Sequence, residues 1–139
     1  MYSAAYQALG GDPAAMHTTE RALKVIRQGL PVSMLDEATR TLGANRADIA
    51  SLIGTTVRSI QRKKATDPLT PQQSEHTLAI VSVYASAADY FGDRDKARLW
   101  MQTPQVIFGN QTAFSYLDTM TGIEFVSDVL TRMKYGMTA

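Results

Sequence analysis

The side chains best suited to recognition chemistry lie close together between positions 55 and 64. Arg58 and Arg62 are four residues apart, so on a helix they share one face, with Ser59 and Gln61 beside them. Such side chains donate hydrogen bonds to guanine and adenine edges in the DNA major groove. Threonines at a helix start and lysines at its end suit phosphate, which positions a protein without reading sequence. The pattern predicts DNA contacts from Thr55, Thr56, Arg58, Ser59, Gln61, Arg62, Lys63 and Lys64.

Two short apolar patterns would position these residues. Gly54 separates them, and each repeats at helical spacing, so the second helix can press one stripe against the first. The inner stripe consists of Ile49, Leu52, Ile53, Val57 and Ile60. Residues 49–64 therefore predict a helix-turn-helix whose outer face carries the polar and cationic side chains.

Charge is concentrated around this motif. The whole chain has a formal net charge of +1, but residues 40–64 contain Asp48 as their single anion. The cations of this segment are Arg40, Arg46, Arg58, Arg62, Lys63 and Lys64. A local basic patch is typical of a nucleic-acid-binding face, although a solvated helix end inside a protein-binding bundle would give the same count.

Composition excludes several other classes of protein. The 139 residues include no cysteine, and His17 and His76 lie far apart, so we expect no metal site and no cofactor. No window approaches the roughly 18 apolar residues of a membrane span. The N-terminus lacks a signal-peptide pattern. The sequence shows no recognisable set of a nucleophile, a general base and a residue that orients the base, and it contains no glycine-rich phosphate-binding loop. We therefore expect no enzyme activity. We expect a soluble, cytoplasmic protein without a membrane partner.

Apolar residues recur at helical spacing in successive segments of the chain. No segment shows the sustained alternation of apolar and polar residues that is typical of a strand. Glycines at positions 29, 43, 54, 92 and 136 mark helix ends. The expected N-terminal caps are Thr18, Ser33, Asn45, Thr55 or Thr56, Thr70, Asp93 and Thr121. The fold class is therefore all-α: an N-terminal helix-turn-helix bundle joined through a long helix to a small C-terminal helical domain.

Four segments are expected. Residues 1–17 are rich in alanine and glycine and predict a flexible arm; residues 18–69 form the helix-turn-helix domain. Residues 70–91 form the connecting helix, with an inner stripe of Leu78, Val81, Tyr84, Ala85, Ala88 and Phe91. Residues 92–139 form the last domain, in which we expect a loop at residues 108–112. Its core aromatic residues would be Trp100, Phe114, Tyr116 and Phe125.

An ordered series of short motifs resembles antitoxins of the Xre/MbcA/ParS family, the partners of RES-domain toxins. The Xre-like helix-turn-helix half is carried by Gly29-Leu30-Pro31, residues 53–63 and residues 69–75. The toxin-binding half is carried by Phe91-Gly92-Asp93, residues 97–101, Leu117-Asp118-Thr119 with Gly122, and residues 130–136. Two positions depart from the family: Ala113 replaces a proline, which predicts a less rigid loop, and Thr56 replaces a serine but keeps the hydroxyl.

The resemblance implies an antitoxin that silences a RES-domain toxin, an enzyme that degrades cellular NAD, and that represses its own operon. In this family the C-terminal end blocks the toxin's active-site cleft. In this chain that role falls on Arg132, Lys134, Tyr135, Gly136, Met137, Thr138 and Ala139. The implied partners are the toxin, double-stranded operator DNA and a second copy of the chain, because repressors of this kind usually dimerise.

Two other functions fit the same residues. One is a stand-alone helix-turn-helix transcriptional regulator whose C-terminal half senses a small ligand in a helical pocket. The other is a protein-binding adaptor with a degenerate helix-turn-helix, which would show no salt-dependent affinity for DNA.

Overall fold

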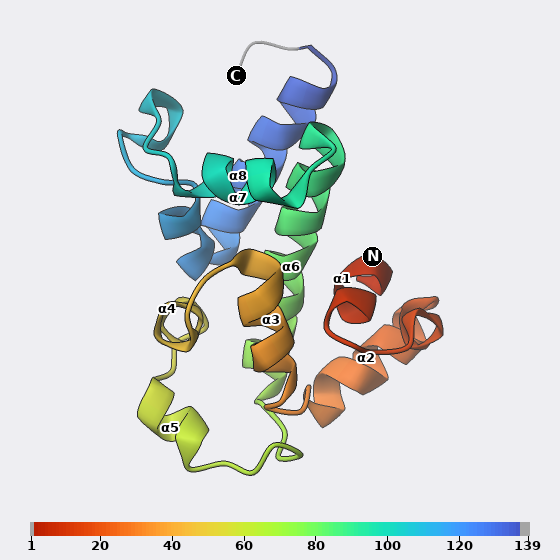
Figure 1. Ribbon diagram of the computed structural model, residues 1–139. Helices are drawn as coiled ribbons and strands as arrows, with labels where there is room; N and C mark the ends of the chain where they lie inside the picture. The colour runs from red at the N-terminus through yellow and green to blue at the C-terminus, as the bar shows by residue number, and fades with distance from the viewer. Residues whose placement is uncertain (1, 137–139) are drawn as a thin grey trace. The chain divides into compact units, whose positions relative to one another are not determined.

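The computed structural model describes residues 2–136, which form helices joined by loops and turns (Figure 1). They form eight α-helices, three short 3-10 helices and no strand, which confirms the all-α prediction. The α-helices are α1 Ser3–Ala8, α2 Thr19–Gln28, α3 Met34–Leu42, α4 Arg46–Leu52, α5 Val57–Gln61, α6 Pro71–Phe91, α7 Arg94–Gln102 and α8 Met120–Lys134. The 3-10 helices are η1 Pro13–Met16, η2 Val106–Phe108 and η3 Phe114–Asp118.

The chain divides into two compact units inside α6, between Ser82 and Val83. The sequence prediction instead ended the helix-turn-helix domain at residue 69 and treated residues 70–91 as a connecting helix. Within the first unit every residue of α6 from position 77 to position 81 is buried, so this part of the helix belongs to the core of that unit.

The first residues are not a flexible arm, contrary to the sequence prediction. Ala5, Leu9 and Met16 are each at most 3% exposed, and α1 contacts η1 and α3. The chain can reverse after α1 because Gly11 lies against the Tyr6 ring, which any Cβ at this position would overlap. A segment rich in alanine and glycine looked unstructured, but small residues also permit this close packing.

Most of the predicted helix starts are confirmed. The side chains of Thr18, Asn45, Thr56 and Asp93 each accept a hydrogen bond from a backbone N–H of the first turn. Thr70 and Gln73 form the reciprocal capping box that starts α6, with both hydrogen bonds 3.1 Å long. Ser33 is an exception, because its side chain makes no capping bond.

A buried hydrogen bond ties α6 to the turn after α2. The Leu30 backbone N–H donates to the Ser74 hydroxyl over 2.8 Å, and both residues are fully buried. The Leu30 carbonyl in turn accepts from the Leu69 N–H, while Gly29, at φ +88°, passes so close to the Leu69 carbonyl that no side chain fits. The segment between α5 and α6 is therefore hydrogen-bonded to the segment between α2 and α3.

Replacing Ser74 with alanine is expected to destabilise the protein by about 1–3 kcal/mol, because the buried Leu30 N–H loses its acceptor. Urea unfolding monitored by circular dichroism measures the change. Ser51→Ala, at an exposed position of α4, is the matched control. Equal unfolding free energies for the two variants would contradict this role of Ser74.

Phe108 is the centre of the second unit. It is completely buried, and the rings of Trp100, Tyr116 and Phe125 lie 5.3–5.8 Å from its ring, centroid to centroid. The sequence placed Phe108 in a loop and chose its half-buried neighbours, with Phe114, as core residues. The loop prediction is thus wrong at its first residue, because one turn of 3-10 helix turns this side chain inward.

Ala113 has a φ of −56°, close to the value that proline imposes, and it is fully buried at the start of η3. The backbone here therefore has the conformation that the family's proline would also permit.

Helix α8 begins two residues earlier than predicted. Thr119, rather than Thr121, accepts the capping bond, from the Gly122 N–H over 2.9 Å. Gly122 lies against the Tyr116 carbonyl, and an ideal Cβ at this glycine would be 1.8 Å from that oxygen. Cap and glycine together explain why these residues recur in the resemblance.

Replacing Gly122 with alanine is expected to destabilise the protein by about 1–3 kcal/mol, because the added methyl group overpacks against η3. If Gly122 did not lie against the Tyr116 carbonyl, alanine at this helical position would stabilise the protein by roughly 0.5–1 kcal/mol relative to glycine. Whether the substitution lowers or raises the free energy of unfolding therefore tests this contact. Thermal unfolding of Gly122→Ala beside Thr121→Ala, an exposed neighbour, provides the comparison. A stabilised Gly122→Ala variant would show that η3 does not pack as described.

Candidate functional site

Helices α4 and α5 form the predicted helix-turn-helix (Figure 1). Gly54, at φ +80°, makes the turn, and the Thr55 N–H donates to the Ala50 carbonyl across it. The predicted inner residues Ile49, Leu52, Ile53 and Ile60 are buried and Val57 is half-buried. The packing of the two helices was thus predicted correctly.

Helix α5 is shorter than the sequence pattern indicated. It ends at Gln61, and Arg62 is its C-cap, so Lys63 and Lys64 follow the helix. The Asp67 carboxylate accepts from the Lys64 N–H over 2.8 Å, and the Asp67 N–H donates to the Lys64 carbonyl. These bonds close a turn that replaces the expected last turn of the helix. Both lysine side chains project from this loop, exposed to solvent.

Two of the hydroxyls selected from the sequence already have partners. The Thr56 hydroxyl accepts from the Ser59 N–H over 3.1 Å and lies 3.0 Å from the Ser59 hydroxyl. Thr55 is half-buried at the turn. The outer face of α5 is therefore dominated by Arg58, Gln61 and Arg62, all exposed.

The cationic side chains of residues 40–64 differ in whether they form an ion pair. Arg40 forms an ion pair with Glu37, and Arg46 pairs with Asp36 over 2.6 Å. Within residues 2–136, no ion pair involves the other four cations, Arg58, Arg62, Lys63 and Lys64. The positive charge left without a protein partner thus lies at α5 and the loop after it, where a phosphate backbone would gain from it.

The end of α8 is the second candidate surface. Arg132, Lys134, Tyr135 and Gly136 are all exposed, and Tyr135 has 67% of its surface accessible. The Lys134 ammonium lies 5.7 Å from the centre of the Tyr135 ring. Gly136 has φ +68°, which ends the helix. Met137, Thr138 and Ala139 lie outside the described residues.

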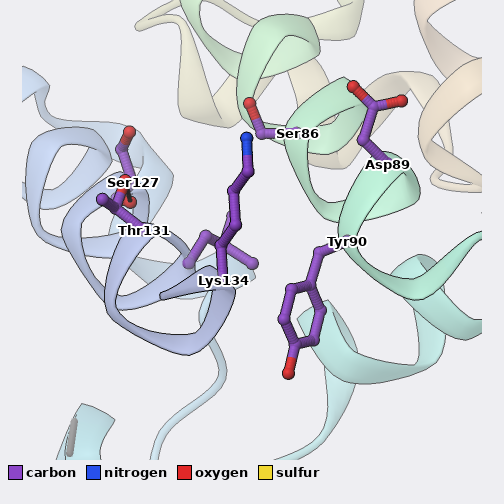
Figure 2. Close-up of a pocket in the computed structure, with 7 residues that line it drawn as sticks. Ser86, Asp89, Tyr90, Ser127, Thr131 and Lys134 are labelled. Carbon is purple, nitrogen blue, oxygen red and sulfur yellow. Dashed lines mark hydrogen bonds between the residues drawn. The ribbon is translucent and has the colours of Figure 1, made fainter. Parts of the chain in front are cut away.

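A groove runs beside this helix end, between the second half of α6 and α8 (Figure 2). Its volume is about 540 Å³. The residues that line it are Ser86, Asp89, Tyr90, Ser127, Leu130, Thr131 and Lys134. In Figure 2 the Lys134 side chain extends between the two helices toward Ser86. No sequence pattern indicated this groove, because it is formed by two helix faces that are distant along the chain.

The metal-ligating and titratable side chains of residues 2–136 show two further features. These residues contain no cluster of three histidine, aspartate or glutamate side chains that could hold a metal ion. Burial raises the pKa of the Tyr84 phenol, with the charge of Arg98 acting in the opposite direction, so Tyr84 stays protonated. In the same part of the chain, no helix is both long and apolar enough to cross a membrane.

Comparison with known proteins assigns a domain family to each part of the chain. Residues 21–82 match the antitoxin Xre-like helix-turn-helix domain, and residues 86–136 match the antitoxin Xre/MbcA/ParS C-terminal toxin-binding domain. The chain is 33% identical over 129 residues to an antitoxin Xre of Yersinia enterocolitica, covering 91% of this chain and 86% of the relative. It is 31% identical over 117 residues to an antitoxin Xre of Photorhabdus laumondii, covering 83% of this chain and 79% of that protein. The chain therefore belongs to the Xre/MbcA/ParS family of antitoxins, with a DNA-binding helix-turn-helix domain followed by a toxin-binding domain.

Proposed function

We propose that this antitoxin neutralises a RES-domain, NAD-degrading toxin by placing its C-terminal end in the toxin's active-site cleft. The observation that supports this proposal is the exposed end of α8, where Arg132, Lys134 and Tyr135 occupy the last residues of the toxin-binding domain. An exposed aromatic ring at a helix end, that of Tyr135, suits contact with another protein, because aromatic side chains are enriched at protein interfaces.

The residues that follow helix α8 would act by filling space. Gly136, Met137, Thr138 and Ala139 would occupy the cleft and keep the substrate out. The antitoxin would thus act by binding and exclusion, without catalysis of its own.

We further propose that a homodimer binds operator DNA and represses the antitoxin's own operon. Arg58, Gln61 and Arg62 would contact base edges, with Ser59 beside them, because these side chains are exposed on one short helix. Thr55, Thr56, Lys63 and Lys64 would contact phosphates. In a dimer the two α5 helices would meet successive major grooves, roughly 34–36 Å apart.

Co-expression with a RES-domain protein encoded beside the antitoxin tests the first proposal. We expect a stable complex by native mass measurement, and loss of NAD degradation in the complex. A ligand-sensing regulator would instead purify without the toxin. If the toxin is neither bound nor inhibited, the proposal is wrong.

A further inference from the structure

The groove between α6 and α8 is lined by polar groups, and only some of them have a partner within residues 2–136 (Figure 2). The Thr131 hydroxyl donates to the Ser127 carbonyl over 3.0 Å. On α6 the lining residues are Ser86, Asp89 and Tyr90, and on α8 they recur at helical spacing. No hydrogen bond of the Ser86 or Ser127 hydroxyl, and no ion pair of Asp89 or Lys134, is found within residues 2–136. A groove of this kind has donors and acceptors available for a partner.

The groove also has an apolar side. Leu130 is buried at its floor, and Tyr90, 42% exposed, forms part of its wall. The Tyr90 ring is the feature of this lining that is typical of a protein-binding site, because aromatic side chains are enriched there. The lining of α8 extends over about 10 Å, at 1.5 Å per residue, which is the length of about three residues of extended chain.

The lining belongs entirely to the toxin-binding domain. Its first residue is Ser86, where the family match begins, and its last is Lys134, the final residue of α8. The groove is therefore continuous with the helix end to which toxin contact has been proposed. The Lys134 ammonium group, which extends between the two helices, and the Asp89 carboxylate on α6 give the groove one charge of each sign, so its occupant has to offer a carboxylate to the first and a hydrogen-bond donor to the second.

We propose that this groove is a docking site for a short segment of the toxin that carries a carboxylate beside an apolar side chain. The proposal rests on the proposed function and extends it. Lys134 pairs with the carboxylate, and Asp89 accepts a hydrogen bond from a donor of the segment. Tyr90 and Leu130 hold the apolar side chain, and the hydroxyls of Ser86 and Ser127 bond to backbone groups of the segment. The groove anchors the toxin, and the chain beyond Lys134 blocks its active site.

Binding and inhibition can then be separated in the full-length chain. Thr131→Arg places a long side chain in the groove at an exposed helical position and is expected to weaken binding of the purified toxin about tenfold or more, measured by calorimetry. The matched control, Thr121→Arg, adds the same side chain at an exposed position of α8 that does not line the groove. It is expected to bind as the wild type does.

Two further measurements make the test independent of one substitution. Tyr90→Ala removes the aromatic wall from an exposed position and should also weaken toxin binding. A chain ending at Lys134 keeps the groove and is expected to form a complex with the toxin without inhibiting it.

Wild-type affinity in both Thr131→Arg and Tyr90→Ala would overturn the docking site while leaving the proposed function standing. Complete loss of binding on removal of residues 135–139 would overturn it as well, since the groove would then be no anchor. If the wild-type chain itself does not bind the toxin, the proposed function fails first and the docking site with it.

Discussion

Removal of residues 135–139 is expected to abolish neutralisation of the toxin and to leave operator binding unchanged. Helix α8 is complete at Lys134, and its buried residues Ile123, Val126, Val129 and Leu130 all precede the cut, so the unit should stay folded. What is lost is the exposed Tyr135, the helix-ending Gly136 and the residues proposed to fill the active-site cleft. The assay is survival of cells that express the toxin together with either the truncated or the full-length antitoxin.

The reciprocal variant provides the control for the truncation. Arg58→Ala with Arg62→Ala changes the other unit and should neutralise the toxin as well as the wild type does. Circular dichroism spectra of both variants would show whether unfolding causes any loss of function. If the truncated protein still protects cells, then the C-terminal end is not the part that blocks the toxin.

Replacing Arg58 and Arg62 with alanine is expected to produce the second large effect, on DNA. Both side chains are exposed and without a protein ion pair in residues 2–136, so their substitution should cost little stability. Each base-reading contact contributes about 1–3 kcal/mol of discrimination, so the double variant should bind its operator at least tenfold more weakly. Fluorescence anisotropy with an operator duplex, at one fixed salt concentration, measures this change.

Arg40→Ala is the matched control for these substitutions. Arg40 is also an exposed arginine of the same unit, but it pairs with Glu37 on α3. Its replacement should change operator affinity far less than the loss of Arg58 or Arg62. Equal affinity of the wild type and the double variant would show that α5 is not the reading helix.

The local parts of the fold were predictable because their causes are local. Caps at Thr18, Asn45, Thr56 and Thr70 form within one turn of a helix, and the residues that make them are near neighbours in the chain. The family motifs likewise identified two domains that the comparisons confirm.

The errors share a physical origin in contacts between distant residues. The segment 2–17 packs because α1 contacts α3 and η1 contacts α2, and Leu9 and Met16 are buried. Phe108 is central because aromatic residues up to 17 positions away surround it. The helix start at Thr119 goes with the close approach of Gly122 to η3. In each case a short stretch of sequence identifies the residue but not the distant residues that it contacts in the fold.

For the functional surfaces the same distinction holds. Residue types and spacing identified the helix-turn-helix, the cationic residues and the all-α class, because helical periodicity and capping are encoded over a few residues. Tertiary structure decided which cations remain unpaired, where α5 ends, and that a groove with unused polar groups lies beside Lys134. Charge pairing and surface shape depend on residues brought together from distant positions, and no pattern within one helix specifies them.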